Sequence, residues 1–228
     1  MEDEKALKIQ SLFRGFQARK GKSGQAVRAN FQEWSDKQKA KILECPYVPT
    51  ALTVVQQFLD LAEVKSDDVV LDIGCGDGRV LIEAAQKCGA RGLGLDIDAD
   101  LIKKADQQIQ AAGEQVASRV KVFKANLNSE EAAQLLRQAT VVFLFLLPTC
   151  QEHVQQMLLS NCAASSPAAA KPAVRIVTSC FSLRGWKPEK VEKHAYLNSV
   201  TNLYLYTFPP NLEEAKIENF SHATETAH

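Results

Sequence analysis

The feature that most constrains this chain is the stretch VVLDIGCGDG at residues 69–78, in which a short apolar run passes into three closely spaced glycines. An apolar run of this length is typical of a strand buried on both faces of a parallel sheet. Gly74, Gly76 and Gly78 permit positive φ angles and let a ligand approach the backbone. A helix is expected directly afterwards, near Arg79 to Cys88, with its free N–H groups pointing at the turn. The stretch therefore predicts a parallel α/β sheet with a ligand site where this strand ends.

A second apolar run, GLGLDID at residues 92–98, leads into a carboxylate. A carboxylate at the end of a neighbouring strand can accept hydrogen bonds from both hydroxyls of a ribose, so Asp96 indicates a nucleoside. The dinucleotide fingerprint needs a third glycine three residues after the second, but position 79 is arginine, which disfavours a nicotinamide oxidoreductase. A glycine turn that serves only packing is the structural alternative.

The three glycines fall at every second position, with Asp72 just before them. This arrangement resembles motif I of the class I S-adenosylmethionine-dependent methyltransferases. The resemblance implies S-adenosyl-L-methionine as the cofactor, and it assigns a part of that molecule to each matching position. The methionine part would be held by Asp72, Gly74, Gly76 and Gly78, the ribose by Asp96 and the adenine by Asn126.

Strands and helices alternate along the chain after the glycine turn, which predicts right-handed crossovers and a doubly wound parallel sheet. An earlier helix over 51–61 is expected from its apolar periodicity, with Thr50 as its N-cap, and another is expected over 31–43. The later strands are predicted at 91–96, 119–125, 140–147 and 173–180, and the later helices at 99–112, 129–138 and 150–159. An Ala/Ser/Pro-rich stretch at 160–172 is typical of a surface connection.

The last two predicted strands, 191–197 and 201–208, are separated by only a short turn, so they can pair antiparallel without a crossover helix. Both alternating faces of TNLYLYTF are largely apolar, as in an interior strand. A parallel sheet closed by an antiparallel hairpin is the seven-stranded architecture of class I methyltransferases. The expected fold class is therefore α/β, a doubly wound Rossmann-like sheet preceded by N-terminal helices.

Four further segments lie at the expected ligand-binding edge of this sheet: PYVPT (46–50), FKANLN (123–128), FLFLLPT (143–149) and CFSLRGWKP (180–188). Together with the two motifs above, they resemble the small protein-lysine methyltransferases related to the enzymes that modify the ATP synthase c subunit and the adenine nucleotide translocase. The resemblance implies that Tyr47, Pro49 and Thr50 line the mouth of the site. Tyr47 and Pro148 become the candidate catalytic residues, as groups that position the substrate.

The Asp/Asn-Pro-Pro-aromatic tetrad of many amino-methyltransferases is absent around Leu147 and Pro148. A nucleobase amine or a glutamine amide therefore loses its usual polar clamp, which favours a lysine substrate. No general base is nominated, because burial beside a positive sulfonium lowers the pKa of a lysine from its reference value of about 10.4.

Composition sets outer limits on function. The chain has 228 residues, with 27 Lys and Arg against 27 Asp and Glu, so it has no global positive field for nucleic acid. Six cysteines are scattered without any C-x-x-C pair, which predicts reduced thiols and no metal site. No apolar run reaches the ~20 residues of a membrane span, and the first residues are acidic and lack a signal region, so a cytoplasmic protein is expected.

Residues 1–28 differ from the rest of the chain, with seven basic residues against three acidic ones. Within them, IQSLFRGFQARK (9–20) matches IQxxxRGxxxR and resembles an IQ-type calmodulin-binding helix. Ile9, Phe13 and Phe16 share one helical face, and the arginines suit an acidic partner such as a calmodulin-like EF-hand protein. A helix that packs on its own domain is the alternative. The candidate calmodulin-binding residues are Ile9, Gln10, Phe13, Arg14, Gly15 and Arg19.

The sequence thus predicts a basic arm at 1–28, a methyltransferase domain at 29–210 and a polar tail at 211–228. The leading hypothesis is a protein-lysine methyltransferase that binds a calmodulin-like protein through its IQ motif. A small-molecule N- or O-methyltransferase and a catalytically inactive, calmodulin-binding scaffold are the two alternatives.

Overall fold

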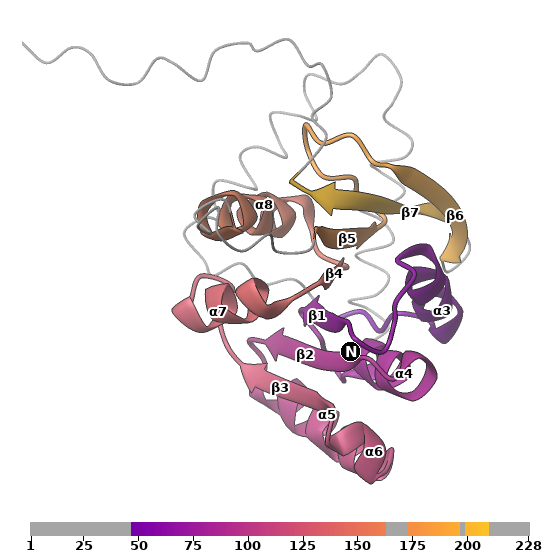
Figure 1. Ribbon diagram of the computed structural model, residues 1–228, viewed down its shortest axis with the longest axis vertical. Coiled ribbons are helices and arrows are strands. Elements are labelled where there is room, and N and C mark those ends of the chain that lie inside the picture. The colour runs from indigo at the N-terminus through magenta and orange to yellow at the C-terminus, as the bar shows by residue number, and fades with distance from the viewer. Residues whose placement is uncertain (1–46, 163–172, 197–198, 210–228) are drawn as a thin grey trace, which may run out of the picture.

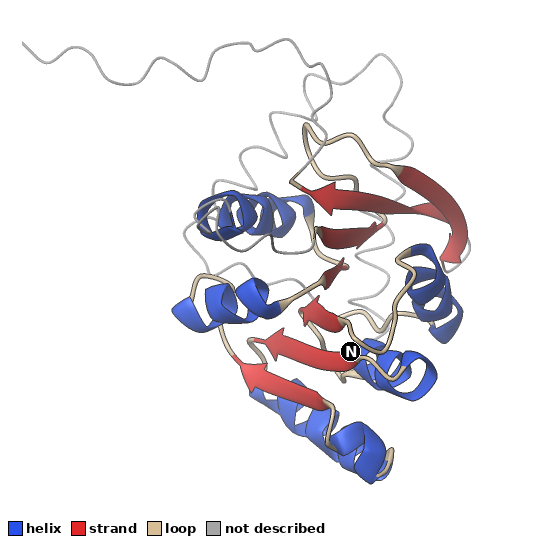
Figure 2. Cartoon of the chain, in the orientation of Figure 1, coloured by secondary structure: helices blue, strands red, loops and turns tan. Residues whose placement is uncertain are grey.

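The structure is a computed structural model that describes residues 47–162, 173–196 and 199–209 (Figure 1). The IQ motif, the helix expected over 31–43, most of the Ala/Ser/Pro-rich stretch and the polar tail lie outside these residues. The described chain forms a central sheet with helices on both of its faces (Figure 2).

The seven strands lie in the order β3-β2-β1-β4-β5-β7-β6. β1 to β5 pair in parallel, and β7 pairs antiparallel with both β5 and β6. This confirms the predicted doubly wound sheet, its C-terminal hairpin and the interior position of the last strand. The strands are β1 (Val69–Ile73), β2 (Arg91–Asp96), β3 (Val120–Lys124), β4 (Val141–Leu144), β5 (Val174–Ser179), β6 (Lys190–Tyr196) and β7 (Ser199–Phe208).

The helices connect these strands and cover them. They are α3 (Leu52–Leu61), α4 (Arg79–Cys88), α5 (Ala99–Ala111), α6 (Glu114–Ala117), α7 (Glu130–Gln138) and α8 (Pro148–Cys162). Helix α4 has the bounds expected from the sequence. Helix α8 begins earlier than expected because Pro148, whose fixed φ suits a first helical turn, opens it. The short α6 was not predicted.

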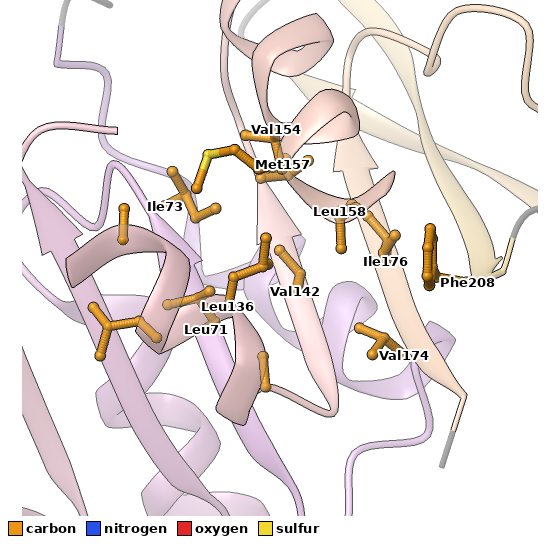
Figure 3. Close-up of a cluster of buried hydrophobic side chains, with 14 of the residues drawn as sticks. Leu71, Ile73, Leu136, Val142, Val154, Met157, Leu158, Val174, Ile176 and Phe208 are labelled. Carbon is orange, nitrogen blue, oxygen red and sulfur yellow. The ribbon is translucent and has the colours of Figure 1, made fainter. Parts of the chain in front are cut away.

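Two apolar clusters, one on each face of the sheet, form the core. Residues of α7 and α8 pack on one face against Leu71 and Ile176 (Figure 3), and residues of α3 and α4 pack on the other against Val70 and Phe143. On that second face, the rings of Phe58 and Phe143 lie 4.6 Å apart between centroids. The parallel strands β1, β2, β4 and β5 are therefore covered on both faces, which explains their nearly continuous apolar sequences, whereas the edge strand β3 is partly exposed.

Asp68, Thr140 and Arg175 form a group of polar contacts, here called the ionic pin, that joins the amino ends of β1, β4 and β5. The Arg175 guanidinium donates to a carboxylate oxygen of Asp68, and the Thr140 hydroxyl donates to the same oxygen at 2.7 Å. Burial alone would raise the pKa of Asp68, but hydrogen bonds from Thr140, from the Lys65 N–H and from Arg175 outweigh that effect and lower it. This pin lies at the sheet edge opposite to the ligand-binding edge and fixes the relative positions of strands from distant parts of the chain.

One predicted cap is wrong. Thr50 was expected to cap α3, but the N-cap is Ala51, in extended conformation and without a capping side-chain hydrogen bond. Thr50 is instead buried, and its backbone carbonyl accepts a hydrogen bond from Arg79. The segment before α3 is thus held by a contact with a distant turn, which local sequence preference cannot anticipate.

Candidate functional site

A cavity of about 760 Å³ opens at the carboxyl ends of β1, β2 and β4. The strand order reverses between β1 and β4, and ligands of doubly wound sheets bind at such a reversal. Of the residues predicted to hold the cofactor, five line this cavity: Asp72, Gly74, Gly76, Asp96 and Asn126. The structure therefore brings together side chains and backbone from three strand ends.

The glycine turn has the left-handed backbone that its sequence predicts, since φ is +53° at Gly76 and +79° at Gly78. A Cβ at Gly76 would lie 2.5 Å from the ring of Tyr47, so only glycine fits there. A Cβ at Gly78 would instead meet Ala105 of α5 at 3.2 Å, and Gly78 is the N-cap of α4 outside the cavity lining. Gly78 thus packs against α5, whereas Gly74 and Gly76 line the cavity.

The Asp96 carboxylate is fixed by two backbone donors. One oxygen accepts from the Gly76 N–H at 3.0 Å and the other accepts from the Asp98 N–H at 2.9 Å. A carboxylate oxygen can accept a second hydrogen bond, so both oxygens keep acceptor capacity for the hydroxyls of a ribose. Ile97, which follows at the rim of the cavity, is 40% exposed and offers an apolar surface beside that position.

Asn126 lies past the end of β3, where its Oδ1 accepts from the Asn128 N–H at 2.9 Å. This local turn fixes the side chain and leaves its NH₂ group as a donor toward a ligand. The arrangement suits a ring nitrogen of adenine, the part that the sequence assigns to this residue.

Asp72 is a buried acid without a counter-ion. It lies on β1 opposite Gly94 of β2 and Phe143 of β4, and its exposed fraction is only 4%. Burial, with smaller contributions from the negative charges of Asp96 and Asp77, raises its pKa to about 8. Within the described residues its carboxyl group makes no hydrogen bond, so a cationic ligand group would satisfy it.

Tyr47, Pro49 and Thr50 line the cavity, as predicted. The Tyr47 hydroxyl is buried and makes no hydrogen bond of good geometry in the described part of the chain. Burial, followed by the charge of Asp77, raises the pKa of Tyr47 to about 12, so the phenol keeps its proton. Pro148 is not a lining residue, and Leu146 and Cys150 face the cavity on either side of it.

Asp77 and Arg79 were not singled out from the sequence, although both line the cavity. They form a two-point ion pair, with Arg79 Nε 2.8 Å from Asp77 Oδ1 and Arg79 Nη2 2.6 Å from Asp77 Oδ2. The sequence does contain a signal, because Arg79 is the first residue of α4 and a cation there opposes the helix dipole.

The described residues include neither a cluster of metal ligands nor a membrane-spanning helix. No group of three or more His, Cys, Asp or Glu side chains is placed to hold a metal ion. No helix among them has the length and apolar character needed to cross a bilayer.

Comparison with known proteins identifies two parts of the chain. The ANTKMT methyltransferase domain matches residues 72–190, and the IQ calmodulin-binding motif matches residues 3–21. A curated protein-lysine N-methyltransferase of Saccharolobus islandicus (strain REY15A) is 35% identical over 162 residues, which are 71% of this chain and 92% of that protein.

Two solved structures also resemble the chain. An RNA methyltransferase from Salinibacter ruber, in complex with S-adenosyl-L-homocysteine, is 34% identical, with a TM-score of 0.60 over 73% of this chain and 97% of that one. A putative O-methyltransferase from Klebsiella pneumoniae shares the fold alone, at 14% identity and a TM-score of 0.52 over 70% of this chain and 81% of that one.

The residues of the cavity fit S-adenosylmethionine. Asp72 is an unpaired acid where an ammonium group is expected, Gly74 and Gly76 bring the backbone of the turn to the cavity, and Asp96 holds two oriented acceptors. The sequence match and the geometry agree: the chain belongs to the ANTKMT methyltransferase domain family and is an S-adenosylmethionine-dependent methyltransferase.

Proposed function

We propose that this enzyme methylates lysine side chains of proteins. The observation that carries the proposal is the charge of the cavity, where the carboxylates of Asp77, Asp96 and Asp98 and the partly ionised Asp72 outnumber Arg79, the one cation among the described lining residues. Such a lining attracts cationic groups and repels phosphate. The 35% identical relative, itself a protein-lysine methyltransferase, supports the same acceptor.

The chemistry asks mainly for alignment. When bound, S-adenosylmethionine supplies a methyl group already activated by its sulfonium. The protein then has to hold an uncharged amine in line with that group, and such positioning accounts for much of an enzyme's rate acceleration. Tyr47 is the proposed positioning group, because it lines the cavity and its buried hydroxyl keeps its proton. Pro148, outside the lining, is proposed to act only by directing the start of α8.

RNA is the competing acceptor, because the 34% identical Salinibacter protein is described as an RNA methyltransferase. A polyanion would have to approach the exposed carboxylate of Asp98, which lines the cavity, and that of Asp100 in the first turn of α5. RNA binding relies on cations that neutralise phosphates, so these carboxylates disfavour it.

The test is methyl transfer from S-adenosylmethionine with a radiolabelled methyl group to a cell extract. After incubation with the full chain, the extract is separated into protein, RNA and small-molecule fractions, and the protein is hydrolysed to free amino acids. Label in methyllysine is expected. Label in RNA or in small solutes would replace the proposal, and no label in any fraction would support an inactive scaffold.

We also propose that residues 1–28 form a separate arm that binds calmodulin or a related EF-hand protein. The match of the IQ calmodulin-binding motif to residues 3–21 supports this. Ile9 and Phe13 would enter an apolar groove of the partner, and Arg14 and Arg19 would meet its acidic rim. The other motif residues proposed to contact the partner are Gln10 and Gly15.

Calorimetric titration of the full chain with calmodulin, with and without calcium, tests the arm. Binding is expected to weaken strongly in Ile9→Ala/Arg14→Glu and to persist in the control Ser11→Ala, which changes a variable position of the motif. Absence of a complex at micromolar concentrations under both conditions would refute this part of the proposal.

A further inference from the structure

We propose that Asp77 and Arg79 clamp residues 47–50, here called the strap, across the glycine turn, and that Arg79 is thereby a positioning residue for methyl transfer. This inference rests on the proposed role of Tyr47 beside the acceptor amine. Neither residue belongs to the glycine and acid positions that match the family's cofactor motif.

The Arg79 guanidinium donates two hydrogen bonds to the glycine turn and one to the strap. Nε and Nη2 contact the two carboxylate oxygens of Asp77, while Nη1 donates to the Thr50 carbonyl at 3.1 Å. A planar fork can make these contacts together, whereas the point charge of a lysine cannot. Arg79 therefore links the first turn of α4 directly to the backbone of the strap.

Lys104 makes a second set of contacts, with Asp77 and with the ring of Tyr47 at the other end of the strap. Lys104 of α5 lies 3.7 Å from Asp77 Oδ2, and its ammonium is 5.8 Å from the centroid of the Tyr47 ring. That ring covers Gly76 so closely that no Cβ fits between them. The aromatic end of the strap is thus held against the turn while Arg79 holds its other end.

Both members of the pair stay charged over the working pH range. Burial acts to raise the pKa of Asp77, but the hydrogen bonds and charge of Arg79 lower it overall, and the hydrogen bonds that Arg79 donates to Asp77 raise the pKa of Arg79. The exposed fractions of the two side chains are 29% for Arg79 and 4% for Asp77, so solvent screens the pair only in part.

The position of Arg79 argues against a role limited to helix stability. The first turn of a helix favours acidic side chains, and α4 has no acid there while its first residue is a cation. Asp77 alone, just before the helix, would satisfy the dipole better than the pair does. The arginine is explained by its contact with the strap, which a helix-stabilising residue would not need.

The experiment compares Arg79→Lys with Arg119→Lys in the full chain. Arg119 also donates to a backbone carbonyl, that of Gly89 at 2.9 Å, but it precedes β3 at the opposite edge of the sheet. The initial rate of methyl transfer to extract protein, at saturating S-adenosylmethionine, is expected to fall about 10- to 100-fold in Arg79→Lys. The rate should stay near that of the wild type in Arg119→Lys.

Two measurements separate the clamp from a general loss of structure. Hydrogen exchange at the backbone amides of the strap should quicken in Arg79→Lys with S-adenosylmethionine bound, while exchange in α4 and β1 stays unchanged. In a double-mutant cycle, Tyr47→Phe and Arg79→Lys should be non-additive, because both act through the position of one ring. Independent effects on the rate, or unchanged exchange in the strap, would overturn the clamp.

The exchange measurement does not depend on the acceptor, so it still tests the clamp if lysine proves to be the wrong substrate. If Arg79→Lys does not fold, Asp77→Asn takes its place. The Asp77→Asn variant keeps the arginine, which can still contact Thr50, but removes the charge that orients the guanidinium. Faster exchange confined to the strap is expected there as well, and exchange equal to that of the wild type would refute the inference.

Discussion

The surroundings of Asp72 predict how the binding of S-adenosylmethionine depends on pH. Its carboxyl group is buried, lies near Asp96 and Asp77, and has a pKa raised to about 8 in the ligand-free protein. The carboxylate form is the one that pairs with the ammonium group of S-adenosylmethionine. Binding at neutral pH must therefore remove a proton from Asp72, and Asp72→Asn should abolish that coupling.

The size of this pH effect follows from the fraction of protein in which Asp72 is ionised, which is the form that binds the cofactor. With a pKa of about 8, about one tenth of Asp72 is ionised at pH 7 and about one hundredth at pH 6. The apparent dissociation constant is the intrinsic one divided by this fraction, so it should rise about tenfold between these pH values. The amino group of the cofactor stays protonated in this range, since a free α-amino group has a pKa of about 7.7–8.0.

Calorimetry of S-adenosylmethionine binding at pH 6 and 7, in buffers of different ionisation enthalpy, measures both quantities. The wild type should lose about tenfold in affinity at pH 6 and release nearly one proton per bound molecule. Asp72→Asn should bind more weakly at both pH values, with no pH dependence and no proton release. Equal pH dependence in the two proteins would refute the assignment of the proton to Asp72.

The same raised pKa has a second consequence, for stability. Between pH 4 and 8 the folded protein holds a proton on Asp72 that the unfolded chain has lost, so stability falls as pH rises through this window. At pH 7 this lowers the free energy of unfolding by an amount on the order of 4 kcal/mol, because each pH unit above 3.8, the ordinary pKa of an aspartic acid, costs about 1.4 kcal/mol. Asp72→Asn should therefore raise the melting temperature of the ligand-free protein at pH 7, and a lower one would contradict the reasoning.

Three further substitutions have defined outcomes. Gly76→Ala should weaken calorimetric cofactor binding, because a left-handed alanine costs about 1–2 kcal/mol and displaces Tyr47; unchanged binding would contradict this. Arg175→Ala should lower the urea-derived free energy of unfolding by about 2 kcal/mol, since it leaves the buried Asp68 carboxylate without its counter-ion, and no loss would refute the pin. Tyr47→Phe should reduce the methyl-transfer rate more than cofactor affinity, and the opposite split would place Tyr47 on the cofactor.

The architecture could be predicted from the sequence because each element carries its own pattern. The apolar run at 69–73, the helical periodicity before it and the two-faced apolar strand near the end each depend on local spacing. The observed β1, α4 and β2 begin and end at the predicted residues. β4 ends three residues before its predicted end, because apolar side chains continue past Leu144 into the cavity wall at Leu146 and so extend the pattern beyond the strand.

The site was only partly predictable, because its remaining residues act through tertiary contacts. Asp96 stands out as an acid at the end of an apolar strand. Asp77 and Arg79 acquire their role only when the strap, some 30 residues earlier, crosses the turn. Gly78 has the spacing of a ligand-contacting glycine, yet its direction is set by α5, whose position no local pattern specifies.

The most direct test of the whole account is mass spectrometry of extract proteins after incubation with S-adenosylmethionine that carries a deuterated methyl group. The full chain is compared with Asp96→Ala, which removes the two oriented acceptors at the ribose position. We predict deuterated methyl groups on lysine Nζ with the wild type, and their loss with Asp96→Ala at low cofactor concentration. Equal lysine labelling by both proteins, or labelling confined to RNA or small molecules, would contradict the account.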